Sequence, residues 1–197
     1  ALRELTFRYI LQDRWDRAES LIFGRGNQAS YRQQYPYQPF GWWAEAEYRL
    51  STDDFGRSVP LLERAQAFSP RNPEIHRVYG RLHLERLDDP RQASRYFETA
   101  RRYGLDRLTF VEMLGRSYYQ SGQYTQAVVE YEKLLNNLDG NSLELTYNLG
   151  SSLLGAGDYD RAEALLDTAF DSGYRNQNIF NLRALLEVLR GNPVEGQ

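Results

Sequence analysis

His76 and His83 are the residues of this chain best suited to metal binding or acid–base chemistry, and they are its only histidines. They lie seven residues apart, which places them on one face of a helix. They could form half of a metal site or an acid–base pair. However, the chain has no cysteine, and no acidic cluster completes a ligand set around them. We therefore predict that both histidines fill packing positions and that the chain has no metal site.

Pairs of acidic residues in short turns are a second candidate for chemistry. They are Asp53 with Asp54, Asp88 with Asp89, and Asp158 with Asp160. Such pairs could hold a cation, but each precedes an expected helix, where a carboxylate caps free N–H groups and favours the dipole. The sequence also has no glycine-rich phosphate loop, no nucleophile elbow and no zinc-type spacing. We predict caps at these turns, no cofactor and no enzyme activity.

A repeated pattern of small residues shows which elements carry these side chains. Its glycines lie 35 residues apart and its alanines 34 and 35 apart, at Gly80, Gly115 and Gly150 and at Ala93, Ala127 and Ala162. A period near 34 predicts a helical repeat array, in which each unit packs only on its neighbours. In this register the histidines take the positions of Val111 and Tyr118.

The residues that mark helix starts and ends predict one repeat domain over residues 1–197. It consists of helical hairpins at residues 1–24, 41–70, 73–104, 107–138 and 142–173, followed by a terminal helix at 177–190. Asn72-Pro73 and Asp89-Pro90 are helix-start signals. Pro60 either lies in the first turn of a helix or kinks it. Residues 25–40 form an aromatic insert without a regular helix, which either covers the first hairpin or presents an interaction surface.

These residues resemble the tetratricopeptide repeat family, whose motif is aromatic-x-x-Leu-Gly-x-x-Tyr, then Ala-x-x-x-Phe, then Pro. The resemblance covers nearly the whole chain and is strongest over residues 73–172. Ala65, Ala100 and Ala169 match a third small position, whereas Leu134 departs from it, and Pro70 alone matches the final proline. The resemblance implies an all-α fold, a right-handed α-solenoid or superhelix.

The resemblance also implies that the first helix of each hairpin lines a concave groove. The candidate partner-binding residues are Arg77, Arg81, Glu112, Arg116, Tyr119, Tyr147, Asn148 and Ser151. Arginine binds carboxylates through two hydrogen bonds and tyrosine offers rigid contact area, so we expect a protein or peptide partner with acidic groups. Alternatively, Arg77, Glu112 and Arg116 pair among themselves across repeats. The lysine–asparagine set that holds a C-terminal carboxylate in some family members is missing.

Charge and hydropathy restrict the class of partner. The net charge of −3 argues against a nucleic-acid binder. Residues 57–107 carry 11 basic against 7 acidic side chains, whereas residues 108–171 carry 3 against 10. No apolar run is long enough to cross a membrane, and no signal-peptide pattern is present. The compartment is open; a bacterial periplasm or envelope is our preferred expectation, and the cytoplasm is an alternative.

The last helix, 177–190, carries two apolar stripes, one of them Phe180, Ala184 and Val188. A terminal helix that faces water should have a polar outer side. Either the repeat array continues beyond this segment, or this helix packs on another molecule, including a second copy. We thus retain three functions: an adaptor that docks a peptide in its groove, a recruiting or regulatory segment of a larger enzyme or envelope complex, and a small-ligand carrier if the groove is closed.

Overall fold

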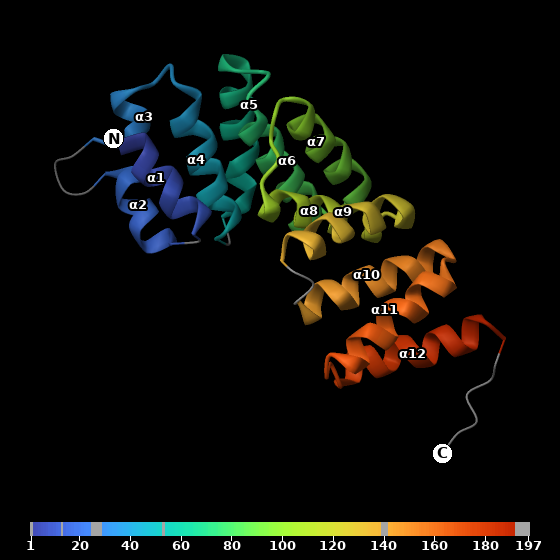
Figure 1. Cartoon of the computed structure of the whole chain (residues 1–197). Coiled ribbons are helices and arrows are strands. Elements are labelled where there is room, and N and C mark those ends of the chain that lie inside the picture. Colours follow the sequence, from blue (N-terminus) through green and yellow to red (C-terminus); the bar gives the residue numbers. More distant parts are fainter. Residues whose placement is uncertain (1, 13, 25–28, 53, 139–141, 192–197) are drawn as a thin grey trace. The chain divides into compact units, whose positions relative to one another are not determined.

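The computed structural model describes residues 2–12, 14–24, 29–52, 54–138 and 142–191, and within these ranges every regular element is a helix (Figure 1). The α-helices are α1 (Leu2–Leu11), α2 (Trp15–Phe23), α3 (Tyr31–Gln34), α4 (Pro39–Leu50), α5 (Ser58–Phe68), α6 (Pro73–Glu85), α7 (Pro90–Arg102), α8 (Leu108–Gln120), α9 (Tyr124–Asn137), α10 (Leu143–Ala156), α11 (Tyr159–Asp171) and α12 (Gln177–Leu189). A 3-10 helix, η1 (Phe55–Arg57), precedes α5. The predicted all-α class is confirmed.

The chain divides into two compact units, residues 1–105 and residues 106–197, and each is described by itself. In unit 1, α1 packs on α2, α4 on α5 and α6 on α7. In unit 2, α8 packs on α9 and α10 on α11, while α12 packs on both α10 and α11. The first helices of successive hairpins begin at residues 39, 73, 108 and 143, and α12 begins at 177. These helices therefore keep the period of 34 to 35 residues.

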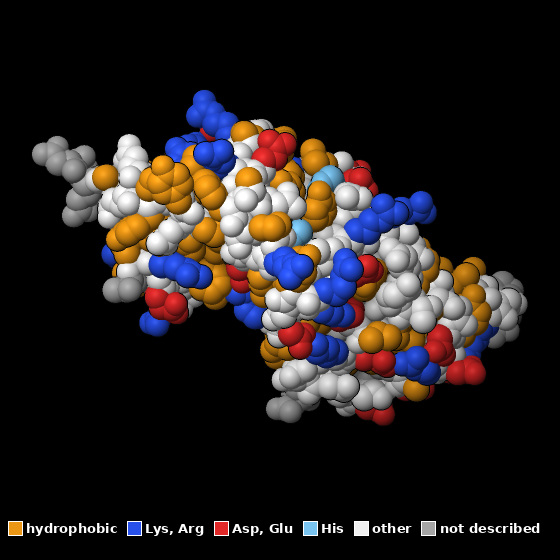
Figure 2. All heavy atoms as spheres, turned by 90° about the horizontal axis from the view of Figure 1, so that it is seen from above, with side chains coloured by type: hydrophobic (Ala, Val, Ile, Leu, Met, Phe, Trp, Pro, Cys, Tyr) orange, Lys and Arg blue, Asp and Glu red, His pale blue; other side chains and the backbone are white. Residues whose placement is uncertain are grey.

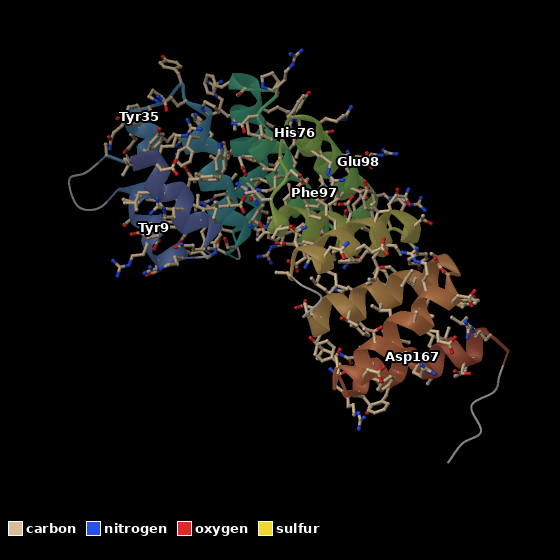
Figure 3. The ribbon with its side chains drawn as sticks, in the orientation of Figure 1. Tyr9, Tyr35, His76, Phe97, Glu98 and Asp167 are labelled. Atoms are coloured by element: carbon tan, nitrogen blue, oxygen red, sulfur yellow. The ribbon has the colours of Figure 1, made fainter. Side chains whose placement is uncertain are left out.

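Small residues lie where two helices of a hairpin approach closely. A Cβ added to Gly80 of α6 would lie 2.4 Å from the ring of Phe97 of α7, a side chain labelled in Figure 3. A Cβ at Gly115 would lie 3.1 Å from the ring of Tyr131. The matching alanines on the second helices are fully buried: Ala93, Ala127 and Ala162. The close packing predicted from the repeat is therefore confirmed.

The region around the insert differs from the prediction in two details, and a third detail decides between two predicted alternatives. One helical turn, α3, forms before Pro36, because the side chains of Ser30 and Gln33 cap each other's backbone N–H groups. Helix α4 begins at Pro39 and not at residue 41, so it takes in the end of the predicted insert. Helix α5 begins at Ser58, which puts Pro60 in its first turn, one of the two predicted alternatives.

The aromatic residues of this region divide between the core and the surface. Tyr31, Phe40 and Trp43 are buried in the core of unit 1, where Phe40 and Trp43 pack edge to face with their ring centroids 5.1 Å apart. In contrast, the side chain of Tyr37 is 79% exposed. Tyr31 and Phe40 thus pack into the core, as one of the two predicted roles requires, whereas Tyr35 and Tyr37 are exposed, as the other role requires.

Most of the acidic turns cap helix N-termini, and the two histidines pack against an aromatic ring. Asp89 accepts a hydrogen bond of 3.0 Å from the backbone N–H of Gln92 at the start of α7. Asp54 instead forms an ion pair with Arg49, and Asp53 lies outside the described residues. His76 and His83 both stack on the ring of Tyr96, at centroid distances of 6.4 and 5.2 Å. Within the described ranges, no group of three His, Cys, Asp or Glu side chains is arranged to hold a metal ion.

Candidate interaction surface

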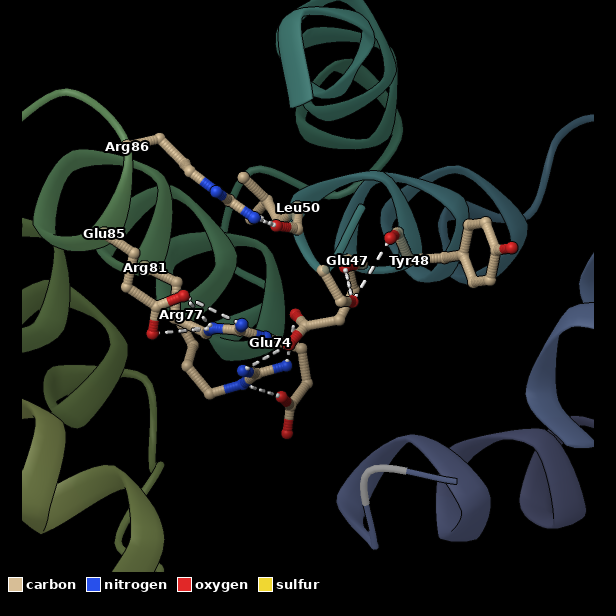
Figure 4. Close-up of polar contacts among 9 residues, drawn as sticks. Glu47, Tyr48, Leu50, Glu74, Arg77, Arg81, Glu85 and Arg86 are labelled. Atoms are coloured by element: carbon tan, nitrogen blue, oxygen red, sulfur yellow. Dashed lines mark hydrogen bonds and ion pairs between the residues drawn. The ribbon is translucent and has the colours of Figure 1, made fainter. Parts of the chain in front are cut away.

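In unit 1, the two predicted arginines lie in an ion-pair network around Glu47 (Figure 4). Helix α4 carries Glu47 and helix α6 carries both arginines. The guanidinium of Arg77 donates two hydrogen bonds to the Glu47 carboxylate, of 3.0 and 2.7 Å, and a third of 2.8 Å to Glu74. Arg81 pairs with Glu47 and, at 2.9 Å, with Glu85. Each arginine is thus shared between two carboxylates.

The network is buried, and its charges stabilise one another. Arg77 is only 4% exposed and Glu47 only 2%. Burial alone raises the pKa of Glu47, but the guanidiniums of Arg77 and Arg81 outweigh it and lower the pKa from 4.5 to about 2. Burial lowers the pKa of both arginines, but the surrounding carboxylates outweigh it, so both pKa values are raised. Glu47 is therefore ionised at every ordinary pH.

This geometry changes how Arg77 and Arg81 are to be interpreted. From the sequence we expected both arginines to line an open groove, where they could bind acidic groups of a partner. The structure shows that an acid of the preceding hairpin already occupies both guanidiniums. The alternative paired Arg77 with Glu112 and Arg116, whereas the carboxylates that Arg77 contacts are those of Glu47 and Glu74. In this structure Arg77 joins α4 to α6 and has no open face to offer a partner.

In unit 2, three of the predicted residues come together on the first helices. Tyr147 and Ser151 of α10 both lie close enough to Tyr119 of α8 to affect its ionisation. Burial is the main cause that raises the pKa of Tyr119, and Tyr147 and Tyr124 add to it, while the Ser151 hydroxyl opposes it. Tyr119 and Tyr147 still expose 38% and 36% of their surface. They are half-packed aromatic side chains on a solvent-facing surface.

The remaining predicted residues flank these tyrosines. Glu112 and Arg116 are exposed residues of α8, and both act electrostatically on the buried Tyr131 of α9. Asn148 of α10 is half-buried. Glu112 also lines a pocket of about 190 Å³ with Thr109 and residues of α9 and α10. We call the surface formed by Glu112, Arg116, Tyr119, Tyr147, Asn148 and Ser151 the tyrosine face.

Exposed apolar side chains lie on α12, which packs on α10. Leu185, Val188 and Leu189 are 45%, 56% and 43% exposed. In the repeat register Leu185 takes the position of Arg116 and Ser151, and Val188 takes that of Tyr119. Phe180, on the same predicted stripe as Val188, is also about half exposed. The apolar surface predicted for this helix is therefore present in the structure.

The surface of the molecule is otherwise mixed in charge. Figure 2 shows basic, acidic and apolar side chains interspersed over the face in view. The structure also reveals a polar pocket in unit 1, around Arg32, Glu45 and Arg49, that the sequence analysis missed. Its signal in the sequence is the charge of Glu45 and Arg49, at repeat positions where later hairpins carry Tyr, Leu or His.

Two family models match the sequence, both described as tetratricopeptide repeat. One matches residues 82–141 and the other residues 118–186, and together they cover just over half of the chain. The chain belongs to the tetratricopeptide repeat family. Tetratricopeptide repeats generally form a non-catalytic protein-interaction fold, and the family membership supports a protein-interaction adaptor. No curated protein sequence matches it.

Solved tetratricopeptide structures share the fold at low sequence identity. PilW, a widely conserved type IV pilus biogenesis factor, is 17% identical with a TM-score of 0.66, over 97% of this chain and 85% of its own. PilF of Pseudomonas aeruginosa is 18% identical with a TM-score of 0.67, over 98% and 84%. YrrB, a tetratricopeptide repeat protein with an unusual peptide-binding site, is 16% identical with a TM-score of 0.72, over 82% of each chain. No described helix is long and apolar enough to cross a membrane.

Proposed function

We propose that this adaptor docks an extended or helical segment of a partner protein on the tyrosine face of unit 2. The observation that carries the proposal is the half-exposed pair Tyr119 and Tyr147 on neighbouring first helices. Aromatic anchors of this kind dominate the energy of interfaces, and the polar Asn148 and Ser151 beside them can pair with a peptide backbone. The peptide-binding site of the similar protein YrrB supports the same kind of partner.

The charge of unit 2 favours a partner segment that is neutral or basic. Residues 108–171 carry 3 basic against 10 acidic side chains. The arginines that suggested an acidic partner, Arg77 and Arg81, are matched within unit 1 by Glu47, Glu74 and Glu85. Electrostatic steering toward the tyrosine face therefore favours positive charge on the partner, and binding should weaken as salt is added.

Alanine replacement of the two tyrosines tests this proposal. Tyr119→Ala and Tyr147→Ala should each weaken capture of the partner from source cells at least about tenfold, as aromatic hot spots do. Tyr37→Ala is the matched control, because Tyr37 is an exposed tyrosine of unit 1. Recovery of the same partners at the same strength by all three variants would refute docking on this face. Changes at Arg77 are unsuitable here because they disturb the buried network.

Self-association through α12 is a second candidate, and the exposed Leu185, Val188 and Leu189 favour it. Replacing Val188 by Asp should abolish any concentration-dependent rise in mass in sedimentation experiments, while the wild-type chain should show such a rise. A wild-type chain that stays monomeric over the whole concentration range would remove this candidate.

We also propose an envelope location, in which this segment recruits partners to a larger complex. PilW is described as a pilus biogenesis factor, and its fold covers nearly the whole of this chain. Fractionation of source cells should find the protein with the periplasm or envelope. Recovery only in the cytoplasmic fraction would refute the location without affecting the docking proposal.

A further inference from the structure

The pocket of unit 1 has a volume of about 430 Å³, within the range of small-molecule sites. It lies among α3, α4, η1 and α5, and it combines apolar and charged walls. Trp42, Pro60 and Leu61 form the apolar part, and the charged part consists of Arg32, Glu45, Arg49 and Arg57. This combination of an apolar wall with a few convergent charges is typical of ligand sites.

In the repeat register, the later hairpins have no carboxylate at the position of Glu45 and no arginine at that of Arg49. Glu45 stands at the position of Tyr79, Leu114 and Leu149 in the following hairpins, which are all buried. Arg49 stands at the position of His83, Tyr118 and Leu153. Glu45 is itself only 7% exposed. Burying a charge is costly, and apolar packing fills the same place three times elsewhere in the chain.

The guanidiniums around the pocket form few close hydrogen bonds with the carboxylates beside them. The closest atoms of Glu45 lie 3.4 Å from Arg32 and 3.5 Å from Arg49, which is an ion-pair distance and not a close hydrogen bond. Arg49 bonds to Asp54 at 2.7 Å, but its buried Nε–H has no hydrogen-bond partner. The side chain of Arg57 is 72% exposed, and the one described carboxylate with which it pairs is that of Asp54, at 3.4 Å. Donors of Arg57 are therefore left over at the pocket.

The balance of charge and the aromatic wall define the class of ligand. Three arginines face two carboxylates, Glu45 and Asp54, so the site has one positive charge in excess. The guanidinium of Arg32 lies 4.7 Å from the centre of the Trp42 ring, which holds a charge beside a flat apolar surface. A single negative charge joined to an apolar group complements both features.

We propose that this pocket binds a carboxylate that carries an aromatic or similar apolar group. Arg49 and Arg57 bind the carboxylate, and Trp42 and Leu61 contact the apolar group. Two sources share this chemistry: a free small acid, and the C-terminal carboxylate of a peptide that ends in an aromatic residue. The proposal is independent of the tyrosine face, which lies in unit 2.

Calorimetry on the full chain tests the charge requirement with two matched pairs of probes. They are 3-phenylpropionate with its amide, and a short peptide ending in Phe with a free or an amidated C-terminus. At least one acid should bind, and its amide should bind about tenfold more weakly or not at all, because charge-assisted hydrogen bonds are lost. If only the small acid binds, the natural ligand is a free metabolite. If the peptide binds more tightly than the small acid, the natural ligand is the C-terminus of a chain. Equal binding of acid and amide, or no binding of any acid, would overturn the proposal.

Two variants locate the binding and separate it from a purely structural role of the charges. Arg57→Gln should weaken the acid about tenfold with no change in melting temperature, whereas Arg91→Gln, an exposed arginine of α7, should bind as wild type. Glu45→Gln removes the competing carboxylate and should strengthen binding of the acid severalfold. If Arg57→Gln or Glu45→Gln binds as wild type does, the charges of this pocket serve the fold alone and the proposal fails.

Discussion

Replacement of Glu47 by Gln is the most informative test of the unit 1 network. Glutamine has nearly the shape of glutamate, so the change removes the charge and leaves the packing. Glu47 is fully buried and accepts hydrogen bonds from both Arg77 and Arg81. The variant would leave these two buried guanidiniums with Glu74 and Glu85 as their only carboxylates.

The size of the effect follows from two independent lines. Breaking a buried ion pair by removing one partner costs about 3–5 kcal/mol, and the lower end applies because each arginine keeps a second carboxylate. The lowering of the Glu47 pKa from 4.5 to about 2 gives a similar figure, about 3 kcal/mol. We therefore expect the free energy of unfolding to fall by about 3 kcal/mol at pH 7.

The pH dependence of the difference in unfolding free energy between wild type and Glu47→Gln is a more specific test than its size at pH 7. Because the folded-state pKa of Glu47 is lowered, its stabilisation is full above about pH 5 and is lost as the pH falls toward 2. Protonated Glu47 resembles glutamine, so the gap between wild type and variant should narrow in acid. By pH 3.5 it should have shrunk to roughly half.

Urea unfolding followed by tryptophan fluorescence reports on the unfolding of unit 1, which contains Glu47. All three tryptophans, Trp15, Trp42 and Trp43, lie in unit 1, and urea does not screen charges as guanidinium does. Glu63→Gln, a change at an exposed acid of α5, is the control and should alter stability by less than about 0.5 kcal/mol. A Glu47→Gln variant as stable as wild type at pH 7, or a gap that does not change with pH, would refute the reasoning.

Further predictions concern close packing and ionisation. Gly80→Ala should lower the free energy of unfolding by about 1–3 kcal/mol, because the new Cβ meets the Phe97 ring. Gly56→Ala is the control and should be nearly neutral, because a Cβ at Gly56 would lie in open space. Equal urea midpoints for the two variants would contradict this prediction. Burial raises the pKa of Tyr79 to about 12, with smaller contributions from neighbouring groups, so its contribution to stability should fade between pH 10 and 12. A Tyr79→Phe variant that loses stability over this range as steeply as wild type does would oppose that assignment. Burial lowers the pKa of His83, so its NMR titration should have a midpoint below 6.5, and a midpoint at or above 6.5 would be inconsistent with this packing.

The parts of the fold that the sequence predicted depend on residues close together in the chain. Small residues at a fixed period, such as Gly80 and Ala93, locate the helix contacts because each hairpin packs within about 30 residues. Caps such as Asp89 are likewise local. Helix α3 was missed because one turn has no apolar period, although Ser30 and Gln33 spell a capping box that could have been recognised.

The candidate site was less predictable, because its contacts join distant residues. Glu47 lies 30 residues from Arg77, and the direction in which its side chain points depends on the register of α4, which begins at Pro39. One residue along a helix turns a side chain by about 100°, which decides whether an acid faces solvent or a neighbouring arginine. Tyr119 and Tyr147, in contrast, are exposed, which leaves them accessible to a partner.

A photo-crosslinking amino acid placed at residue 147 in source cells tests docking on the tyrosine face most directly. Val129 of α9 is the control position, because its side chain is 59% exposed and therefore more accessible than Tyr147. We predict one discrete crosslinked partner from position 147, diminished by Tyr119→Ala, and none from position 129. Equal crosslinking from both positions, or crosslinking from position 129 alone, would contradict the account.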